Sequence, residues 1–593
     1  MNQRPPVLAL LGAACLAFSV TLARPVPDKP ANDVQLRAMT DELARAKKLE
    51  LSDLEKPYFI QYVSSDGEDT VVFASLGGIT SSRSARVRRP SVIVRVGDYA
   101  FDNTNSIFSG FPPLGLMPLD DDYGVIRTEF WRATDVAYKS AVDQIARKRN
   151  ALREIADPDK TADLAPAKVI HEFEPIPTSN FNRSSWESLL RQVSGIFASH
   201  AGVMTSSVNV RSITSTYRMI NSEGSAIRLP QTLDSVQIRA TAVAPDGNHV
   251  WNHEFVTELE SSKLPESKEL AKLSETVASQ TEALAKAPQA EDYSGPVLFE
   301  SEAAAQMMAQ VLADAITPRR KPVAPPGSND RSLQVVDSVW ASKIGVKVAP
   351  DWMNVWDDPL AAKFEGRDLV GYYKVDDEGV AAQKVSIVEK GIFRNYLLSR
   401  VPFRTFNGSN GHGRLPGPFG SEAGVIGNLF VQSSAPVPES QLKSRLLERV
   451  KSAGLKFGVV ARRLDFPSTA PLGELQGLVR QMQKNGFVRT LNSPLLAYLV
   501  YPDGREELVR GFRFREFSAK DLRDLDAASD KPFVFNYVNN GSGLNYADAG
   551  SDATTSSVIC PALLFDSLEL AKAENEIGAP PIVPPPALVP AQR

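Results

Sequence analysis

The chain contains little cysteine and little histidine. Of its 593 residues, two are Cys and five are His. If the segment containing Cys15 is removed on export, Cys560 is left without a partner, so no intramolecular disulfide can form. Five histidines offer few metal ligands and few general bases, and no Gly-x-Ser-x-Gly motif for a serine nucleophile occurs. Cys560 lacks the flanking pattern of a thiol protease, and we expect it to lie in the core.

An excess of positive charge is also absent. The formal net charge is −4 and the isoelectric point is near 5.9, so no basic footprint for nucleic acid is present. Hydrophobic residues make up 43% and charged residues 23%, which is typical of a globular chain with two or three domains.

Only one long apolar run occurs, and it lies at the amino terminus. Val7–Ala23 is preceded by Arg4 and is typical of a secretory signal cleaved after Ala23. We therefore expect a signal peptide over 1–23, a Pro-rich leader over 24–33, and a mature protein that is periplasmic or secreted with no transmembrane span. An uncleaved anchor and a lipoprotein modified at Cys15 are alternatives.

Residues 34–260 predict an N-terminal α+β domain. A helix is expected over Val34–Leu49, antiparallel hairpins over Tyr58–Phe101, and strands again between Ser206 and Leu259. In the hairpin region we place turns at Ser-Asp-Gly-Glu and at Arg-Pro. Two amphipathic helices, Arg127–Ile155 and Ser184–Ser199, are expected to cover one face of the sheet.

Two histidines lie close together in this domain. His249 and His253 could chelate a metal only on a helix, whereas the surrounding pattern predicts a strand. On a strand their side chains would stand about 13 Å apart, too far to share one ion. The Lys/Glu/Ala-rich residues 261–292 then predict a solvated linking helix.

Residues 293–572 predict a second domain. It begins with the stretch Gly295–Gln310 (GPVLFESEAAAQMMAQ), which indicates a buried strand followed by an apolar-faced helix. The Pro-rich Thr317–Asn329 is expected to be an exposed, mobile loop. A further helix is expected over Gly473–Asn485, and residues 573–593 predict a Pro-rich disordered tail.

Two polar segments of this domain could carry function. The acidic turn, Asp376–Glu378, is interpreted as a turn with an acidic rim and not as a metal site, because consecutive carboxylates cannot all face one ion. The glycine loop, Asn407–Arg414 (NGSNGHGR), could instead approach a ligand closely. Within it, Asn410, Gly411, His412, Gly413 and Arg414 are the candidate substrate-binding residues. We expect this loop to edge a groove in which an extended peptide pairs by backbone hydrogen bonds.

Five stretches carry a resemblance to a known family. They are Gly295–Gln310, Tyr373–Arg400, Ser409–Arg414 (SNGHGR), Tyr501–Gly511 (YPDGREELVRG) and Ala562–Leu570 (ALLFDSLEL). Together they resemble the TldD/PmbA family of zinc peptidases and their metal-free homologues, with the resemblance strongest after Gly295. This implies a two-domain α+β fold of antiparallel sheets with packed helices.

The resemblance also implies what the chain has lost. Active members carry His-Glu-x-x-x-His on the helix after Gly295, whereas this chain has Phe299 and Ala304 in the two histidine places and keeps only Glu300. We therefore expect no metal and no cofactor, with Glu300 as a vestigial catalytic residue. Family members also use a cysteine ligand, but Cys560 lies nearer the end of the chain, so that role is not transferred.

Three functions remain open at this point. The first is a PmbA/TldE-like metal-free subunit or pseudopeptidase that binds extended peptides, as a homodimer or with a TldD-like paralogue. The second is an active metallopeptidase whose zinc is held by a non-standard site. The third is a non-catalytic envelope assembly protein.

Overall fold

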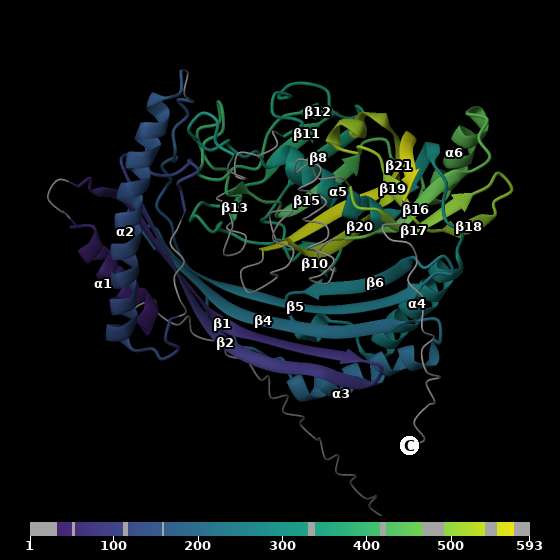
Figure 1. Ribbon diagram of the computed structural model, residues 1–593, viewed down its shortest axis with the longest axis horizontal. Helices are drawn as coiled ribbons and strands as arrows, with labels where there is room; N and C mark the ends of the chain where they lie inside the picture. Colours follow the sequence, from purple (N-terminus) through teal and green to yellow (C-terminus); the bar gives the residue numbers. More distant parts are fainter. Residues whose placement is uncertain are drawn as a thin grey trace, which may run out of the picture.

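Two large β-sheets organise the chain, one in each half (Figure 1). The computed structural model describes residues 32–49, 54–110, 117–156, 159–329, 338–414, 423–466, 491–539 and 554–573. The predicted α+β fold with packed helices is confirmed. The predicted signal peptide, most of the leader, the helix over Gly473–Asn485 and nearly all of the tail lie outside the described residues.

The N-terminal sheet has six strands in the order β2-β1-β4-β5-β3, with β6 pairing on β5. Its strands are β1 (Pro57–Ser75), β2 (Gly78–Val96), β3 (His171–Phe173), β4 (Thr205–Asn221), β5 (Ala226–Val243) and β6 (His249–Glu258). Its helices are α1 (Val34–Ala46), α2 (Tyr123–Arg153), α3 (Arg183–Gly195) and α4 (Ser267–Lys286), with short 3₁₀ turns at Ile196–Ser199 and Ser261–Lys263. The helices α1 and α2 cover one end of the sheet and α3 and α4 the other (Figure 1).

The turns of the first hairpin differ from the prediction. Residues Ser65–Gly67, which we expected to turn, lie inside the 19-residue strand β1. Gly67 serves a close approach between strands, because a Cβ there would lie 2.2 Å from the Cβ of Ser215 on β4. The chain reverses instead at Leu76 and Gly77, which both have positive φ angles, as a two-residue hairpin turn requires.

Two connecting segments are more ordered than their composition indicates. The predicted linking helix is α4, and its buried residues Leu270, Val277 and Ala278 pack in the core of the N-terminal sheet, so the solvated description is wrong for this face. The Pro-rich loop is held at Val323, which forms a parallel bridge with Ser106. Because Ser106 belongs to the N-terminal domain, this bridge joins the two domains.

The C-terminal sheet has eleven strands and surrounds β21, which pairs with β7, β15, β19 and β20. The strands are β7 (Tyr293–Phe299), β8 (Met353–Asp357), β11 (Val385–Glu389), β12 (Ile392–Phe393), β15 (Asn428–Ser433), β16 (Gly458–Leu464), β17 (Pro494–Val500), β18 (Glu506–Val509), β19 (Phe512–Phe514), β20 (Leu525–Asn539) and β21 (Thr554–Lys572). The pairs β15/β21 and β16/β7 run parallel, and the other strand pairs of this sheet are antiparallel. Cys560 is buried in β21, as expected for a core residue.

Helices and short ribbons complete this domain. They are α5 (Ser301–Ile316), α6 (Glu439–Ser452), a 3₁₀ helix at Ala519–Asp524, and two small ribbons formed by β9 (Lys363–Phe364) with β10 (Arg367–Asp368) and by β13 (Gly413–Arg414) with β14 (Ala423–Gly424). The core is a large apolar cluster in which α5 packs with residues of β7, β16 and β21. No helix among the described segments is both long and apolar enough to cross a membrane.

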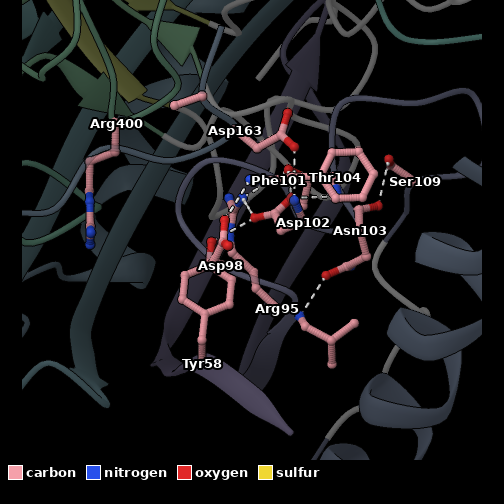
Figure 2. A network of polar contacts seen from close by, with 12 residues as sticks. Tyr58, Arg95, Asp98, Phe101, Asp102, Asn103, Thr104, Ser109, Asp163 and Arg400 are labelled. Carbon is pink, nitrogen blue, oxygen red and sulfur yellow. Dashed lines mark hydrogen bonds and ion pairs between the residues drawn. The ribbon is translucent and has the colours of Figure 1, made fainter. Parts of the chain in front are cut away.

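A buried polar network lies where the two domains meet (Figure 2). Asp102 is fully buried and accepts hydrogen bonds from Arg95 at 2.9 Å and from the Tyr58 hydroxyl at 2.7 Å. From the C-terminal domain, Arg400 donates two hydrogen bonds to the carbonyl of Ala165, at 2.9 and 2.8 Å. These buried charged side chains fix the relative orientation of the segments that they join. Moving one segment would leave a buried charge without its hydrogen-bond partners.

Candidate functional site

The ligand segment, Phe299–Ala304, spans the junction of a strand and a helix. Phe299 is the last residue of β7, Glu300 caps the start of α5, and Ala304 lies in its first turn. The Glu300 backbone is extended, and its carbonyl accepts the first helical hydrogen bond from the Ala304 N–H at 2.8 Å. The local structure therefore agrees with the predicted strand-to-helix transition.

Both places that the resemblance assigns to histidine ligands are filled by apolar packing. The Phe299 ring is fully buried, stacked on Phe514 with centroids 5.6 Å apart and edge-on to Phe565 at 5.5 Å. Ala304 is equally buried. Zinc requires nitrogen, sulfur or oxygen donors, so these two side chains do not fit the ion that the fold family implies.

Glu300 faces away from this apolar cluster. Its side chain is 42% exposed, and one carboxylate oxygen lies 3.0 Å from Nε of Arg462. Arg462 also donates to Glu506 at 2.8 Å and lies over the ring of Tyr498. In this position Glu300 belongs to a partly exposed ion-pair network, and its predicted vestigial role stays a prediction.

The glycine loop is not the exposed rim that we predicted. The His412 ring is fully buried, with Nε2 3.1 Å from Oδ1 of Asp357 and Nδ1 3.1 Å from both the backbone and the side-chain oxygen of Asn410. Asp357 also accepts the backbone N–H groups of Gly427 and Asn428. Every polar atom of the ring thus has a partner, as expected for a histidine that organises a loop.

Arg414 and the loop glycines are equally enclosed. Arg414 donates to Asp377 at 3.2 Å and lies 4.5 Å above the Tyr373 ring. Gly411 has φ +76°, and a Cβ there would lie 2.2 Å from the carbonyl oxygen of Ala381. A Cβ on Gly413 would meet the Glu378 carboxylate at 2.0 Å. The glycines are required because the loop packs against its own domain.

The acidic turn is the surface against which the loop packs. The predicted turn is present, but its acidic residues are buried and do not form a rim. Asp376 is fully buried and accepts three backbone N–H groups, from Glu378 at 3.0 Å, Val380 at 2.8 Å and Gly413 at 2.9 Å. Burial raises the pKa of Asp376 to about 7, against the opposing effect of these donors. The hydrogen bonds of Asp376 therefore give the acidic turn a structural role.

The glycine loop and Glu300 lie at opposite ends of α5. Leu397 donates to the carbonyl of Ile316, the last residue of the helix, and Leu398 donates to the side chain of Asn410. A 16-residue helix is about 24 Å long, so the loop is remote from the helix start. The predicted site residues do not converge on one centre.

Other candidate metal ligands are also apart. His249 and His253 lie on strand β6, as predicted, so their side chains do not form a chelating pair. Within the described ranges, no group of three or more His, Cys, Asp or Glu side chains is placed to hold one metal ion.

The sequence-based prediction did not include two residues that organise these regions. Asp357 is the first of two consecutive aspartates at the end of β8, and Arg463 is the second of two consecutive arginines in β16. Neither lies in a motif of recognisable spacing, because their partners are distant in sequence. The repeated charges next to apolar residues were the available signal.

The fold consists of two large sheets with packed helices, and Phe299 and Ala304 of the ligand segment are apolar and buried. Residues 292–453 match the family described as the PmbA/TldA metallopeptidase C-terminal domain. TldE from Thermococcus kodakarensis has a similar fold, with a TM-score of 0.54 and 13% identity over 90% of this chain and 100% of that one. The predicted resemblance to the TldD/PmbA family is confirmed by these matches.

Curated relatives match over shorter segments. A metalloprotease of Methanothermobacter thermautotrophicus is 26% identical over 204 residues, which cover 34% of this chain and 40% of the relative. A metalloprotease of Methanocaldococcus jannaschii is 40% identical over 82 residues, or 14% of this chain and 17% of the relative. The match thus spans less than half the length of these relatives.

Proposed function

We propose that this chain is a metal-free, PmbA/TldE-like subunit that binds extended peptides within a peptidase complex. The observation that carries this proposal is the ligand segment, where Phe299 and Ala304 are buried apolar residues and Glu300 pairs with Arg462. A zinc hydrolase needs about three protein ligands and an open position for water. The chain has the fold of the family, but its ligand segment does not supply the protein ligands that zinc needs.

Peptide binding is supported by an accessible strand edge. Among the described strands of the N-terminal sheet, β2 is 19 residues long and pairs only with β1, and residues 80–86 are exposed on both of its faces. Such an edge offers backbone groups to an extended peptide or to a partner's strand. The glycine loop, with His412 buried, supports its own domain in this proposal.

The alternative of an active metallopeptidase is favoured by the names of the curated relatives, and one experiment separates the two functions. The tagged full chain is recovered from its native envelope, and zinc content and peptide cleavage are measured for the wild type and for Glu300→Gln. We expect less than one zinc per chain when it is alone, cleavage only in fractions that retain a related subunit, and a change under about twofold in Glu300→Gln. Stoichiometric zinc and cleavage by the chain alone, lost in Glu300→Gln, would establish the alternative.

Export is a further part of the proposal. A mature protein that begins near Arg24 and fractionates outside the cytoplasm is the expected result of amino-terminal sequencing. An intact Met1 on membrane-bound protein would favour an anchor. Capture of no related subunit, with a monomeric protein in gel filtration, would favour the envelope assembly role.

A further inference from the structure

His253 lies at the joint between the two domains. It is on β6, the strand of the N-terminal sheet that lies nearest the C-terminal domain in Figure 1, and it is fully buried. Its ring stacks with that of Phe255 at 6.1 Å, and Phe255 in turn packs edge-on against Phe535 of the C-terminal domain at 5.4 Å. Any movement of β6 away from the C-terminal domain therefore exposes this imidazole.

Neither nitrogen of this ring has a hydrogen-bond partner in the part of the chain that the structure describes. The charged groups nearest to it are Arg239, opposite on β5, and Arg463, from β16, and both oppose a positive charge on the ring. Glu254 on β6 and Glu302 on α5 are engaged by Arg463. Burial, with the two guanidinium groups, holds the pKa of His253 well below its usual range.

The same joint is linked to the start of α5. Arg463 donates to the carbonyl of His253 at 2.7 Å and to Asn252 at 3.3 Å, while its Nε donates to Glu302 at 3.0 Å. One side chain therefore connects β6 to the first turn of the helix that follows the ligand segment. If β6 separated from the C-terminal domain, the nearly buried guanidinium of Arg463 would lose its acceptors on β6. We therefore expect the contacts of the joint to break together.

We propose that His253 is an acid-sensitive release point, at which uptake of one proton by the ring opens the joint between β6 and the C-terminal domain. In the closed state a protonated ring would find no acceptor and two neighbouring cations, whereas an open joint exposes it to water. Open forms then bind a proton that the closed form does not. Below a pH of about 6.5, the population of the open joint should rise up to about tenfold per pH unit. This inference does not rest on the proposed function.

Hydrogen exchange at neutral and acidic pH tests the proposal on the full chain, after correction for intrinsic exchange rates. In the wild type, amides of β6 and β16 should open about fivefold more often at a pH of about 5.5 than at about 6.5, with β1 changing less. In His253→Phe this difference should disappear, because the ring loses no hydrogen bond and cannot take up a proton. His249→Phe, on the same strand but exposed, is the matched control and should behave as the wild type.

The contrary results are equally defined. A His253→Phe variant with the wild-type dependence on pH, or equal opening of β1 and β6, would overturn the proposal. If the variant does not fold, nuclear magnetic resonance titration of the wild-type histidine rings decides. A His253 ring that titrates in the folded protein at a pH of about 6.5 or above refutes the proposal, and one that stays neutral to a pH of about 5.5 supports it.

Discussion

The ligand segment and the glycine loop are both buried, but they are stabilised by opposite means. Around Phe299 the packing is aromatic, and the ring is part of the hydrophobic core. Around His412 the packing is polar, with hydrogen bonds to Asp357 and Asn410 and an adjacent carboxylate, Asp376, that accepts three backbone groups. An apolar core stays packed without hydrogen-bond partners. In a buried polar network, the stability of each group depends on the partners that satisfy it. Three changes test this contrast.

The largest effect is expected at the ligand segment. Phe299→Ala would leave a cavity among Phe514, Phe517 and Phe565, and we expect a loss of about 3–5 kcal/mol in the free energy of unfolding. Urea denaturation of the wild type and the variant measures this loss. Leu360→Ala is the control, because Leu360 is 48% exposed and should change stability by less than about 0.5 kcal/mol. Equal values for both variants would contradict the buried position of Phe299.

A smaller loss is expected in the glycine loop. His412→Ala leaves the buried carboxylate of Asp357 without one of its partners, which should cost about 2–3 kcal/mol. Asn407→Ala, in the same loop but exposed, should leave the melting temperature nearly unchanged. Thermal denaturation of the two variants compares them directly. A His412→Ala protein as stable as Asn407→Ala would restore the exposed loop that the sequence predicted.

The smallest effect concerns the pH dependence of the acidic turn. With a folded-state pKa of about 7, Asp376 holds a proton that the unfolded chain has already released, so its stabilising contribution is lost as the pH rises through that value. Between pH 6 and 8 the expected loss is about 1 kcal/mol, and Asp376→Asn should remove it. The test is the difference between variant and wild type in urea denaturation at the two pH values. The pKa of His253 is lowered, so its effect on stability with rising pH has the opposite sign. If Asp376→Asn lost more stability than the wild type between pH 6 and 8, the raised pKa of Asp376 would be refuted.

Much of the fold could be predicted from local pattern. The strand and helix of Gly295–Gln310 and the helices predicted over Val34–Leu49 and Arg127–Ile155 follow from hydrophobic periodicity, and they are confirmed. The errors share one cause. Ser65–Gly67 and Val323 lie in stretches whose residue types are typical of turns and loops. Their backbone nevertheless pairs with strands or segments that are distant in the sequence. Tertiary pairing overrides local preference where a neighbouring segment supplies the hydrogen bonds.

The sequence by itself determined that Phe299 and Ala304 carry no donor atom for a metal, because the chemistry of a side chain is visible without any structure. That these positions are the two histidine places is what the resemblance to the TldD/PmbA family implies. It also determined the α+β class, since helix and strand periods are properties of local sequence. Only the tertiary structure decided that His412 and the acidic turn are buried and that the ring of His253 has no hydrogen-bond partner among the described residues. Burial and hydrogen bonding depend on residues more than a hundred positions apart, such as His253 and Arg463, and no short pattern in one chain encodes that distance.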